Sequence, residues 1–381
     1  MKTLFILNSD FGVEGTVGSR ILPLAKELLK NKELIILCRN FKEELTNKYN
    51  IKKVVPFGSI IMKILYGITI FSFQKFKSNK IKNKIFEFFL IRKLKKIDLS
   101  QIDMIHSWDF LPRTYEILKN KNPKIKIIQD VAMAFLNIIK NIKDKEKLFK
   151  YDRLESPNYL KDAFRYIDIF VAPSEFVKKS LINEGIEENK IVIVPFGVDI
   201  NKFKPINKDL NGKFKVAFSG NVNNRKGIPY LIEAWKELNL ENAELNIYGR
   251  IYPEVRKYLK NTKKYNINLY GFIDLTQELP KNHVYVFPSL LEGSAKSIYE
   301  ALACGLPVIT TFNSGSIIRD DEEGFIVPIQ NTGALKEKIL FFYNNRNKIK
   351  EFGERARRLA EEYTWKRYGK EVNKLYRLVL K

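Results

Sequence analysis

Short apolar runs alternate with segments of helix length along most of the chain. In the first half the runs are three to six residues long and are bordered by turn residues. Continuous apolar runs separated in this way are typical of parallel strands in a sheet that helices cover on both faces. We therefore expect strands at Leu4–Leu7, Leu34–Leu37, Lys53–Val55, Met104–His106, Ile125–Ile128, Ile167–Ala172 and Ile191–Val194.

The pattern pauses and then starts again. Pro, Gly and Asn are frequent between residues 194 and 213, which indicates a connection between domains. The sequence thus predicts two doubly wound, Rossmann-like α/β domains, near residues 1–200 and 210–360. They would face each other across a cleft at the carboxyl ends of their strands, where ligands bind in open sheets of this type. The strands expected in the second domain are Phe214–Phe218, Leu245–Tyr248, Ile267–Tyr270, Val284–Phe287, Val308–Thr310 and Phe325–Val327.

The charge balance and the scarcity of metal ligands narrow the classes of function. Lys and Arg number 67 against 43 Asp and Glu, a net charge of +24. This favours an anionic partner: a nucleotide, a phosphorylated substrate, nucleic acid or a membrane surface. Two Cys, two His and no Asp-x-Asp argue against a zinc site or a two-carboxylate metal clamp. No apolar run reaches the roughly 18 residues of a spanning helix, and no secretory signal is evident, so we expect a cytoplasmic protein.

A glycine-containing loop follows the first strand of the second series. It carries Gly220, Arg225, Lys226 and Gly227 ahead of an expected helix at Tyr230–Leu238. Glycines let the backbone approach a phosphate, a helix N-terminus favours an anion, and Arg and Lys supply charged donors. The pattern favours a phosphate-binding loop, although a plain strand-to-helix turn with two solvated cations fits it as well.

Two glutamates eight positions apart flank the start of a later helix. Glu292 follows the expected strand Val284–Phe287, and Glu300 lies in the helical run Ser297–Ala303. The apolar neighbours of Glu300 indicate that this helix is mostly buried, and a buried carboxylate needs a polar partner. A ribose diol suits it, because a carboxylate accepts hydrogen bonds from both hydroxyls. The alternative is an ordinary acidic residue on a helix surface.

In their order and spacing, several motifs make the chain resemble a known family from nearly end to end. The motifs are Glu292-x7-Glu300 with the Ala-Leu-Ala-Cys-Gly-Leu-Pro run, Arg225-Lys226-Gly227, residues 172–177 with 194–199, and residues 363–368. The chain resembles the family 4 glycosyltransferases of the GT-B fold. The resemblance is loose over the first 165 residues, where such an enzyme recognises its acceptor.

The resemblance implies a retaining transferase that uses a nucleotide-diphosphate sugar. Lys226 and Arg225 would hold the diphosphate and offset the charge that develops on it, and Glu292 would complete the catalytic set. Because the chain has no Asp-x-Asp, these cations would replace a metal, and no cofactor is expected. Glu300 would hold the ribose, and a C-terminal helix at about 362–381 would pack back on the N-terminal domain. The other donor-binding positions would be Gly15, Gly220, Phe272, Ile273, Gly293, Ser294, Ala295 and Ser297.

The chain departs from the family's pattern in two places. Asn221 stands where many relatives carry an Arg, so Arg225 would supply that charge. Many relatives also carry a His after the fifth N-terminal strand, near the reacting sugar, and this chain has none there. Asp130 is the nearest polar candidate for the acceptor side. His106 is the other, although its place at the end of a strand favours a structural role. We expect His283 to be structural.

A basic and aromatic segment suggests where the acceptor lies. Residues 60–96 contain ten Lys and Arg against one acid, with six Phe among them. Cations interleaved with aromatics suit a helix on an anionic lipid surface, which favours a peripheral protein on the inner face of the cell membrane. A solvated basic face of the N-terminal domain or a nucleic-acid surface are the alternatives. A glycan or lipid-linked acceptor would fit the membrane interpretation.

The leading hypothesis is therefore a glycosyltransferase of cell-surface polysaccharide, lipopolysaccharide or glycolipid synthesis. UDP-sugars are slightly favoured over GDP-sugars as donors. A catalytically inactive GT-B protein that binds nucleotide sugars is an alternative, as is a phosphorylase or epimerase of the same fold. A basic nucleic-acid-binding protein would leave Glu292 and Glu300 unexplained, so no nucleic acid is expected. A Rossmann dehydrogenase fits poorly, since the loop Gly12-x-x-Gly15-x-x-Gly18 lacks a Gly-x-Gly start.

Overall fold

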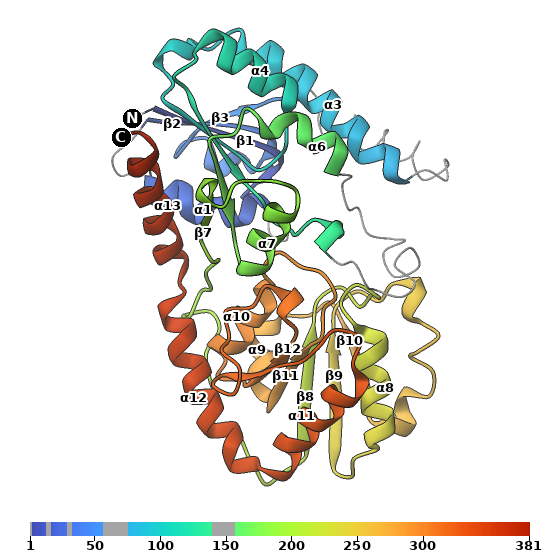
Figure 1. The fold of residues 1–381 in the computed structure, drawn as a ribbon. Coiled ribbons are helices and arrows are strands. Elements are labelled where there is room, and N and C mark those ends of the chain that lie inside the picture. The colour runs from blue at the N-terminus through green and yellow to red at the C-terminus, as the bar shows by residue number, and fades with distance from the viewer. Residues whose placement is uncertain (1, 13–16, 29–32, 56–74, 139–156) are drawn as a thin grey trace.

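Two α/β domains lie one above the other in the computed structural model, each built around a parallel sheet (Figure 1). The structure describes all residues except 1, 13–16, 29–32, 56–74 and 139–156. The predicted architecture of two doubly wound, Rossmann-like domains is confirmed. Gly15 and the first part of the basic segment 60–96 lie outside the described residues.

The N-terminal sheet has seven strands in the order β3-β2-β1-β4-β5-β6-β7, with parallel pairing throughout. The strand order reverses between β1 and β4, and a sheet of this kind opens a crevice at such a point. The strand expected at Lys53–Val55 is shifted: β3 ends at Lys53, and Val54 and Val55 are buried beyond its end. The strands are β1 (Lys2–Phe11), β2 (Glu33–Phe41), β3 (Asn50–Lys53), β4 (Met104–Ser107), β5 (Lys126–Asp130), β6 (Ile169–Ala172) and β7 (Ile191–Ile193).

The C-terminal sheet has six strands in the order β10-β9-β8-β11-β12-β13, again all parallel. Its order reverses between β8 and β11, so the second crevice opens beside the loops that follow these two strands. Those loops carry the motifs around Lys226 and Glu292. The strands are β8 (Phe214–Ser219), β9 (Ala243–Tyr248), β10 (Ile267–Gly271), β11 (Val284–Phe287), β12 (Val308–Thr310) and β13 (Gly324–Ile326).

Helices connect the strands of both sheets, as parallel pairing requires. In the N-terminal domain they are α1 (Val17–Leu28), α3 (Lys75–Leu94), α4 (Pro112–Lys121), α6 (Pro157–Phe164) and α7 (Glu175–Asn183). In the C-terminal domain they are α8 (Ile228–Leu238), α9 (Leu275–Glu278), α10 (Lys296–Ala303) and α11 (Thr332–Asn344). Two more helices, α12 (Arg346–Glu362) and α13 (Trp365–Val379), end the chain.

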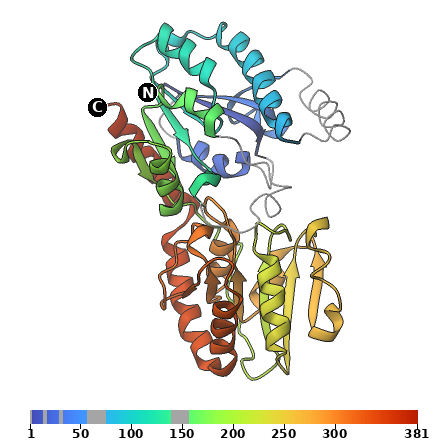
Figure 2. The same cartoon turned by 45° about the vertical axis from the view of Figure 1, so that its right-hand side comes forward.

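The last helix returns to the N-terminal domain. α12 runs along the C-terminal domain, and α13 continues beside the N-terminal one, so that both chain ends lie close together (Figures 1 and 2). α13 packs on α1, where Gly369 lies against the side chain of Glu27. Tyr368 and Tyr376 of α13 belong to the same buried apolar cluster as Phe5 of β1. The side chains of α13 therefore fill part of the N-terminal core.

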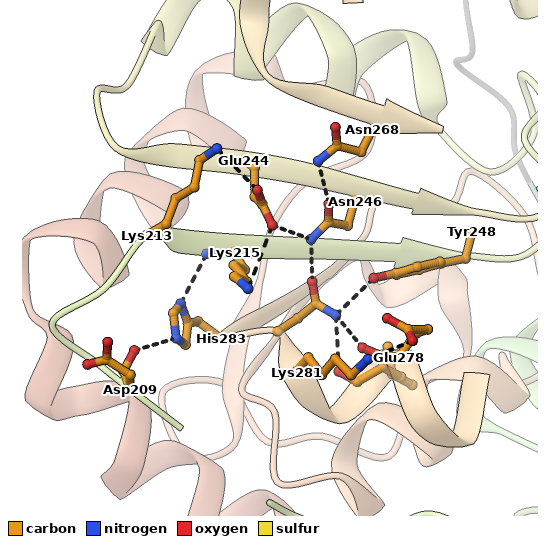
Figure 3. Close-up of polar contacts among 12 residues, drawn as sticks. Asp209, Lys213, Lys215, Glu244, Asn246, Tyr248, Asn268, Glu278, Lys281 and His283 are labelled. Carbon is orange, nitrogen blue, oxygen red and sulfur yellow. Dashed lines mark hydrogen bonds and ion pairs between the residues drawn. The ribbon is translucent and has the colours of Figure 1, made fainter. Parts of the chain in front are cut away.

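One face of the C-terminal sheet is polar near β9 and β10 (Figure 3). Asn246 of β9 accepts a hydrogen bond from Asn268 of β10 and donates one to Asn282, at 2.9 Å each. His283 accepts from the Lys215 amide at 3.0 Å through Nδ1, and its Nε2 lies 3.2 Å from the Asp209 carbonyl oxygen. This network ties the interdomain connection to β8, which agrees with a structural role for His283.

Candidate active site

The loops that follow β8 and β11 pack directly against each other. Gly227 begins α8 with a left-handed φ of 73°, and a Cβ atom there would lie 1.9 Å from the carbonyl oxygen of Pro288. The Leu290 amide donates to the Arg225 carbonyl oxygen at 2.8 Å, and the Ser289 hydroxyl donates to the same oxygen at 3.1 Å. Only glycine permits this approach at position 227, so the two sequence motifs form one unit.

Within that unit, two cations share one carboxylate oxygen. Glu292 Oε1 lies 2.5 Å from Arg225 NH1 and 2.5 Å from Lys226 Nζ, and the three side chains are each at most 13% exposed. Burial raises the pKa of the Glu292 carboxyl, but Arg225 and Lys226 outweigh it and hold that pKa below its usual value. The cluster of two cations and one carboxylate carries a net positive charge, as a site for an anion should.

The segment after Glu292 leads into α10 and is held by hydrogen bonds to neighbouring residues. Ser294 donates to the Gly315 carbonyl oxygen at 2.9 Å and lies 2.8 Å from the Tyr299 hydroxyl. The Ala295 amide donates to the Ser314 carbonyl oxygen at 3.0 Å, and Ala295 begins α10. Ser297 is half-buried, and its hydroxyl hydrogen-bonds with Tyr285. Gly220 lies at the end of β8, where its amide donates to the Tyr248 carbonyl oxygen.

Glu300 faces a large cavity between the domains. The cavity holds about 1060 Å³, and its walls include Gly12 and Leu45 of the N-terminal domain and Phe272, Ile273 and Glu300 of the C-terminal one. Phe272 is 96% exposed, so its ring projects into open space at the cavity. Phe272, Ile273 and Glu300, which the resemblance assigns to the donor, therefore line one cavity.

The environment of Glu300 keeps a largely buried carboxyl close to two lysines. Lys296 Nζ lies 3.4 Å from Glu300 Oε1, and Lys202 of the interdomain connection also lines the cavity. Burial raises the pKa of Glu300, and the attraction of Lys296 and Lys202 offsets only part of that rise. A ligand that donates hydrogen bonds to this carboxylate would relieve the cost of its burial.

Residues of the N-terminal domain form hydrogen bonds with the loop that carries Glu292. Ser174, at the start of α7, donates to the Gly293 carbonyl oxygen at 2.5 Å. The Ala134 amide donates to the Glu292 carbonyl oxygen at 3.3 Å. A Cβ atom on Gly293 would lie 1.8 Å from the Ala132 carbonyl oxygen, so no larger residue fits. The two halves of the site are therefore in direct contact.

The two acceptor-side candidates are buried beneath α13. His106 has no exposed surface, stacks on Trp108 at 4.1 Å, and places Nδ1 2.5 Å from the Tyr376 hydroxyl. Asp130 is 3% exposed; its Oδ2 lies 3.9 Å from His106 Nε2 and accepts from Tyr368 at 3.5 Å. Burial lowers the pKa of His106 to about 3, so the ring is neutral. In this arrangement the His106 ring has no exposed surface for an acceptor to contact.

The chain matches two family models that together span most of its length. Residues 17–202 match a model described as Glycosyltransferase Family 4, and residues 213–345 match one described as Glycosyl transferases group 1. The chain belongs to the family 4 glycosyltransferases. The two matches meet at the interdomain connection that the sequence indicates.

Named relatives of this glycosyltransferase come from archaea and bacteria. An uncharacterized glycosyltransferase of Methanocaldococcus jannaschii is 28% identical over 74% of this chain and 76% of its own length. A capsular polysaccharide biosynthesis glycosyltransferase of Staphylococcus aureus is 29% identical over 55% of this chain and 62% of its own length. Among solved structures, HepE of Anabaena in complex with UDP and glucose has a TM-score of 0.69 at 14% identity, with 99% of both chains covered. This likeness confirms the GT-B fold.

Sequence reasoning missed some residues of this glycosyltransferase site. Ser174 was noted only as part of a motif, because its partner Gly293 is 119 positions away and no local pattern reveals the contact. Gly12 lines the cavity, whereas Gly15 lies outside the described residues. In the part of the chain that the structure describes, no group of three or more His, Cys, Asp or Glu could hold a metal ion. Among the same residues, no helix combines the length and apolar composition needed to cross a bilayer.

Proposed function

We propose that this glycosyltransferase moves a sugar from a nucleotide-diphosphate donor to a glycan or lipid-linked acceptor. One observation carries the proposal: Glu300 and the edge at Phe272 and Ile273 line a cavity between the domains that is large enough for a nucleotide. Arg225 and Lys226 of the same domain would hold the diphosphate. HepE, which shares the fold, binds UDP and glucose. A UDP-sugar is the donor we favour.

The cluster of Arg225, Lys226 and Glu292 would supply the chemistry. As the bond between sugar and diphosphate breaks, negative charge grows on the phosphate oxygens, and two fixed cations in a closed cleft stabilise it. These charges would take the place of a metal ion. Glu292 would orient both cations and lie along the donor sugar. We propose net retention of the anomeric configuration, with the acceptor entering from the N-terminal side.

The exposed face of α3 supports a membrane-bound acceptor. Lys84 and Arg92 are exposed on either side of Phe88, which is 50% exposed, and the Arg92 guanidinium lies 4.2 Å over its ring. The opposite face, with Phe86 and Leu90, is buried. α3 lies along the outside of the N-terminal domain (Figure 1). A cationic and aromatic face on the outer surface fits anionic headgroups, at about 1 kcal/mol per basic residue. We place the protein on the inner face of the cell membrane, where capsular or other surface polysaccharides could be its product.

Calorimetry with UDP, GDP, ADP and CMP tests the donor site. We expect micromolar binding of one diphosphate, weakened at least tenfold in Lys226→Ala and in Glu300→Ala. Lys263→Ala, an exposed lysine of the same domain, is the matched control and should bind as the wild type does. Binding that is absent, or equal in all four proteins, would contradict the proposal and favour an inactive or nucleic-acid-binding protein.

Two further measurements address the reaction itself. With the donor identified, proton NMR of the freshly formed product distinguishes retention from inversion at the anomeric carbon. Activity that survives EDTA would support the metal-free reaction, and activity that returns only with added divalent cations would contradict it.

A further inference from the structure

A second cavity lies where the chain crosses between the domains. The crossing is made twice, by the connection after β7 and by the turn between α12 and α13. The two segments are bound to each other: the Val198 amide donates to the Tyr363 carbonyl oxygen at 2.9 Å, and Val198 forms a β-bridge with Thr364. The connection then continues along α12, and the cavity opens between them.

This hinge cavity holds about 340 Å³ and is separate from the donor site. It is the size of a small ligand pocket. Its walls come from the interdomain connection, from α12 and from the turn after α10, and they include Pro205, Ile206, Lys208, Gly305, Ile349 and Arg357. None of these residues lines the 1060 Å³ cavity around Glu300.

The lining of the hinge cavity combines an apolar wall with an excess of positive charge. Ile206, which is 48% exposed, and Leu210 supply apolar surface, and the buried side chain of Ile349 also lines the cavity. Four cations face one carboxylate; they are Lys208, Lys350, Arg357 and Arg358, against Glu354. Arg357 pairs with Glu361 at 2.7 Å, and the other cations leave an excess of positive charge beside the apolar wall. This combination suits a molecule with a hydrocarbon body and an anionic head.

Lys208 and Arg357 are the two of these cations that are not exposed. Lys208 is half-buried, and one of its three N–H donors reaches the Gly305 carbonyl oxygen at 3.1 Å. Burial lowers the pKa of Lys208 to about 8, so an anion beside the ammonium would favour its charged form. The Nη1 group of Arg357 donates to carbonyl oxygens, including that of Ala303 at 2.7 Å. The cavity thus lies at the C-terminal end of α10, the helix whose first turns carry Lys296 and Glu300.

We propose that the hinge cavity binds a small amphiphilic carboxylate, with its head at Lys208 and its hydrocarbon chain along Ile206, Leu210 and Ile349. The carboxylate would pair with the partly buried ammonium, and the chain would cover the exposed side of Ile206. A ligand in this position touches both the connection and α12, next to the crossing at Val198. The inference does not depend on the donor or the acceptor of the reaction.

Calorimetry on the full chain with octanoate as the probe tests the proposal. We expect one saturable site in the wild type and binding at least tenfold weaker in Lys208→Gln. Lys213→Gln changes a lysine of the same connection that lies outside the cavity, and it should bind octanoate as the wild type does. Octyl glucoside, which has a neutral head, and inorganic phosphate, which has no chain, should each bind at least tenfold more weakly than octanoate.

Lys208→Gln also removes the hydrogen bond to Gly305 and could unfold the site for that reason alone. A second variant therefore tests the site with Lys208 in place. Ile206→Glu changes a largely exposed side chain, keeps Lys208, and places a negative charge on the apolar wall. This variant too should bind octanoate at least tenfold more weakly than the wild type does. The proposal is overturned if octanoate does not bind the wild type, or if Ile206→Glu and Lys213→Gln bind it equally. It is also overturned if octyl glucoside or phosphate binds as tightly as octanoate.

Discussion

The hydroxyl of Ser174 donates a 2.5 Å hydrogen bond across the domain boundary to the carbonyl oxygen of Gly293. The same hydroxyl accepts the Val177 amide at 3.3 Å and so caps α7. One side chain therefore joins the first turn of an N-terminal helix to the loop that carries Glu292. The position of Glu292 depends on both domains, so we expect the proposed donor site to be complete only when they are in contact.

Replacing Ser174 by Ala should impair binding of the donor more than it destabilises the fold. Loss of the helix cap costs about 1 kcal/mol of stability. Loss of the Gly293 contact frees the Glu292 loop, so we expect a donor KM that rises several-fold. Asn331→Ala removes the cap of α11, which is exposed and far from the site, and is the matched control. The two variants should lose similar stability, measured by urea unfolding. An equal donor KM in both would contradict the role of Ser174.

Glu292→Gln should make the stability of the protein depend more strongly on bound nucleotide. The substitution leaves Arg225 and Lys226 largely buried without their shared carboxylate, and breaking a buried pair costs about 3–5 kcal/mol. A bound diphosphate would restore the missing negative charge. We therefore expect a lower Tm than the wild type without ligand and a larger rise in Tm on adding UDP. Equal rises in the two proteins would show that the diphosphate does not contact these cations.

Glu300→Gln should stabilise the folded protein and at the same time weaken its binding of the donor. Burial raises the pKa of Glu300, so above pH 4.5 the ionised carboxylate costs free energy in the folded state only. Gln removes that cost, and we expect a Tm higher by roughly 2 °C at pH 7. It also removes a charged acceptor for the ribose hydroxyls, so UDP should bind about tenfold more weakly. Glu371→Gln, an exposed glutamate of α13, should change neither quantity.

The exposed face of α3 should determine membrane binding. Lys84→Glu combined with Phe88→Ser removes one cation and the exposed ring, and we expect much less protein to sediment with vesicles containing anionic lipid. Lys260→Glu combined with Lys263→Glu makes a larger charge change on the C-terminal domain and should leave sedimentation unchanged. Equal loss in both variants would indicate a general effect of net charge. Unchanged sedimentation of the α3 variant would remove the membrane interpretation.

The sequence predicted the fold well because buried parallel strands leave a clear local pattern. The runs at 214–218 and 284–287 fall on β8 and β11 almost residue for residue. The pattern failed at Val54 and Val55, which are buried although they lie beyond β3. β3 is the edge strand of the sheet, and the Val54 amide still donates to the Cys38 carbonyl oxygen of β2 at 2.9 Å, so pairing with β2 continues just past its end.

The site was predictable only where its residues lie on one loop or one helix. Arg225 and Lys226 are adjacent in sequence, and the resemblance assigned them to one site with Glu292 and Glu300. The structure brings both cations onto the Glu292 carboxylate. Ser174 could not be assigned, because its contact joins two domains. A polar residue at the end of a strand can serve a site or the fold, and the local pattern around His106 did not distinguish the two. Only the path of α13, which brings Tyr376 onto His106, shows that the ring is buried.

His106 should make the folded protein sensitive to mild acid. Burial lowers its pKa to about 3, against 6.5 in the unfolded chain, so below pH 6.5 the unfolded state binds a proton that the folded state does not. Stability then falls as the pH drops, and between pH 7 and 5 this one ring costs about 2 kcal/mol. His106→Gln should start less stable at pH 7, because it loses packing on Trp108, yet should lose about 2 kcal/mol less on moving to pH 5. Trp108→Leu disturbs the same packing without a titrating group, so it should lose as much as the wild type. Urea unfolding of the three proteins at both pH values measures these differences, and an equal acid loss in all three would mean that His106 is protonated in the fold.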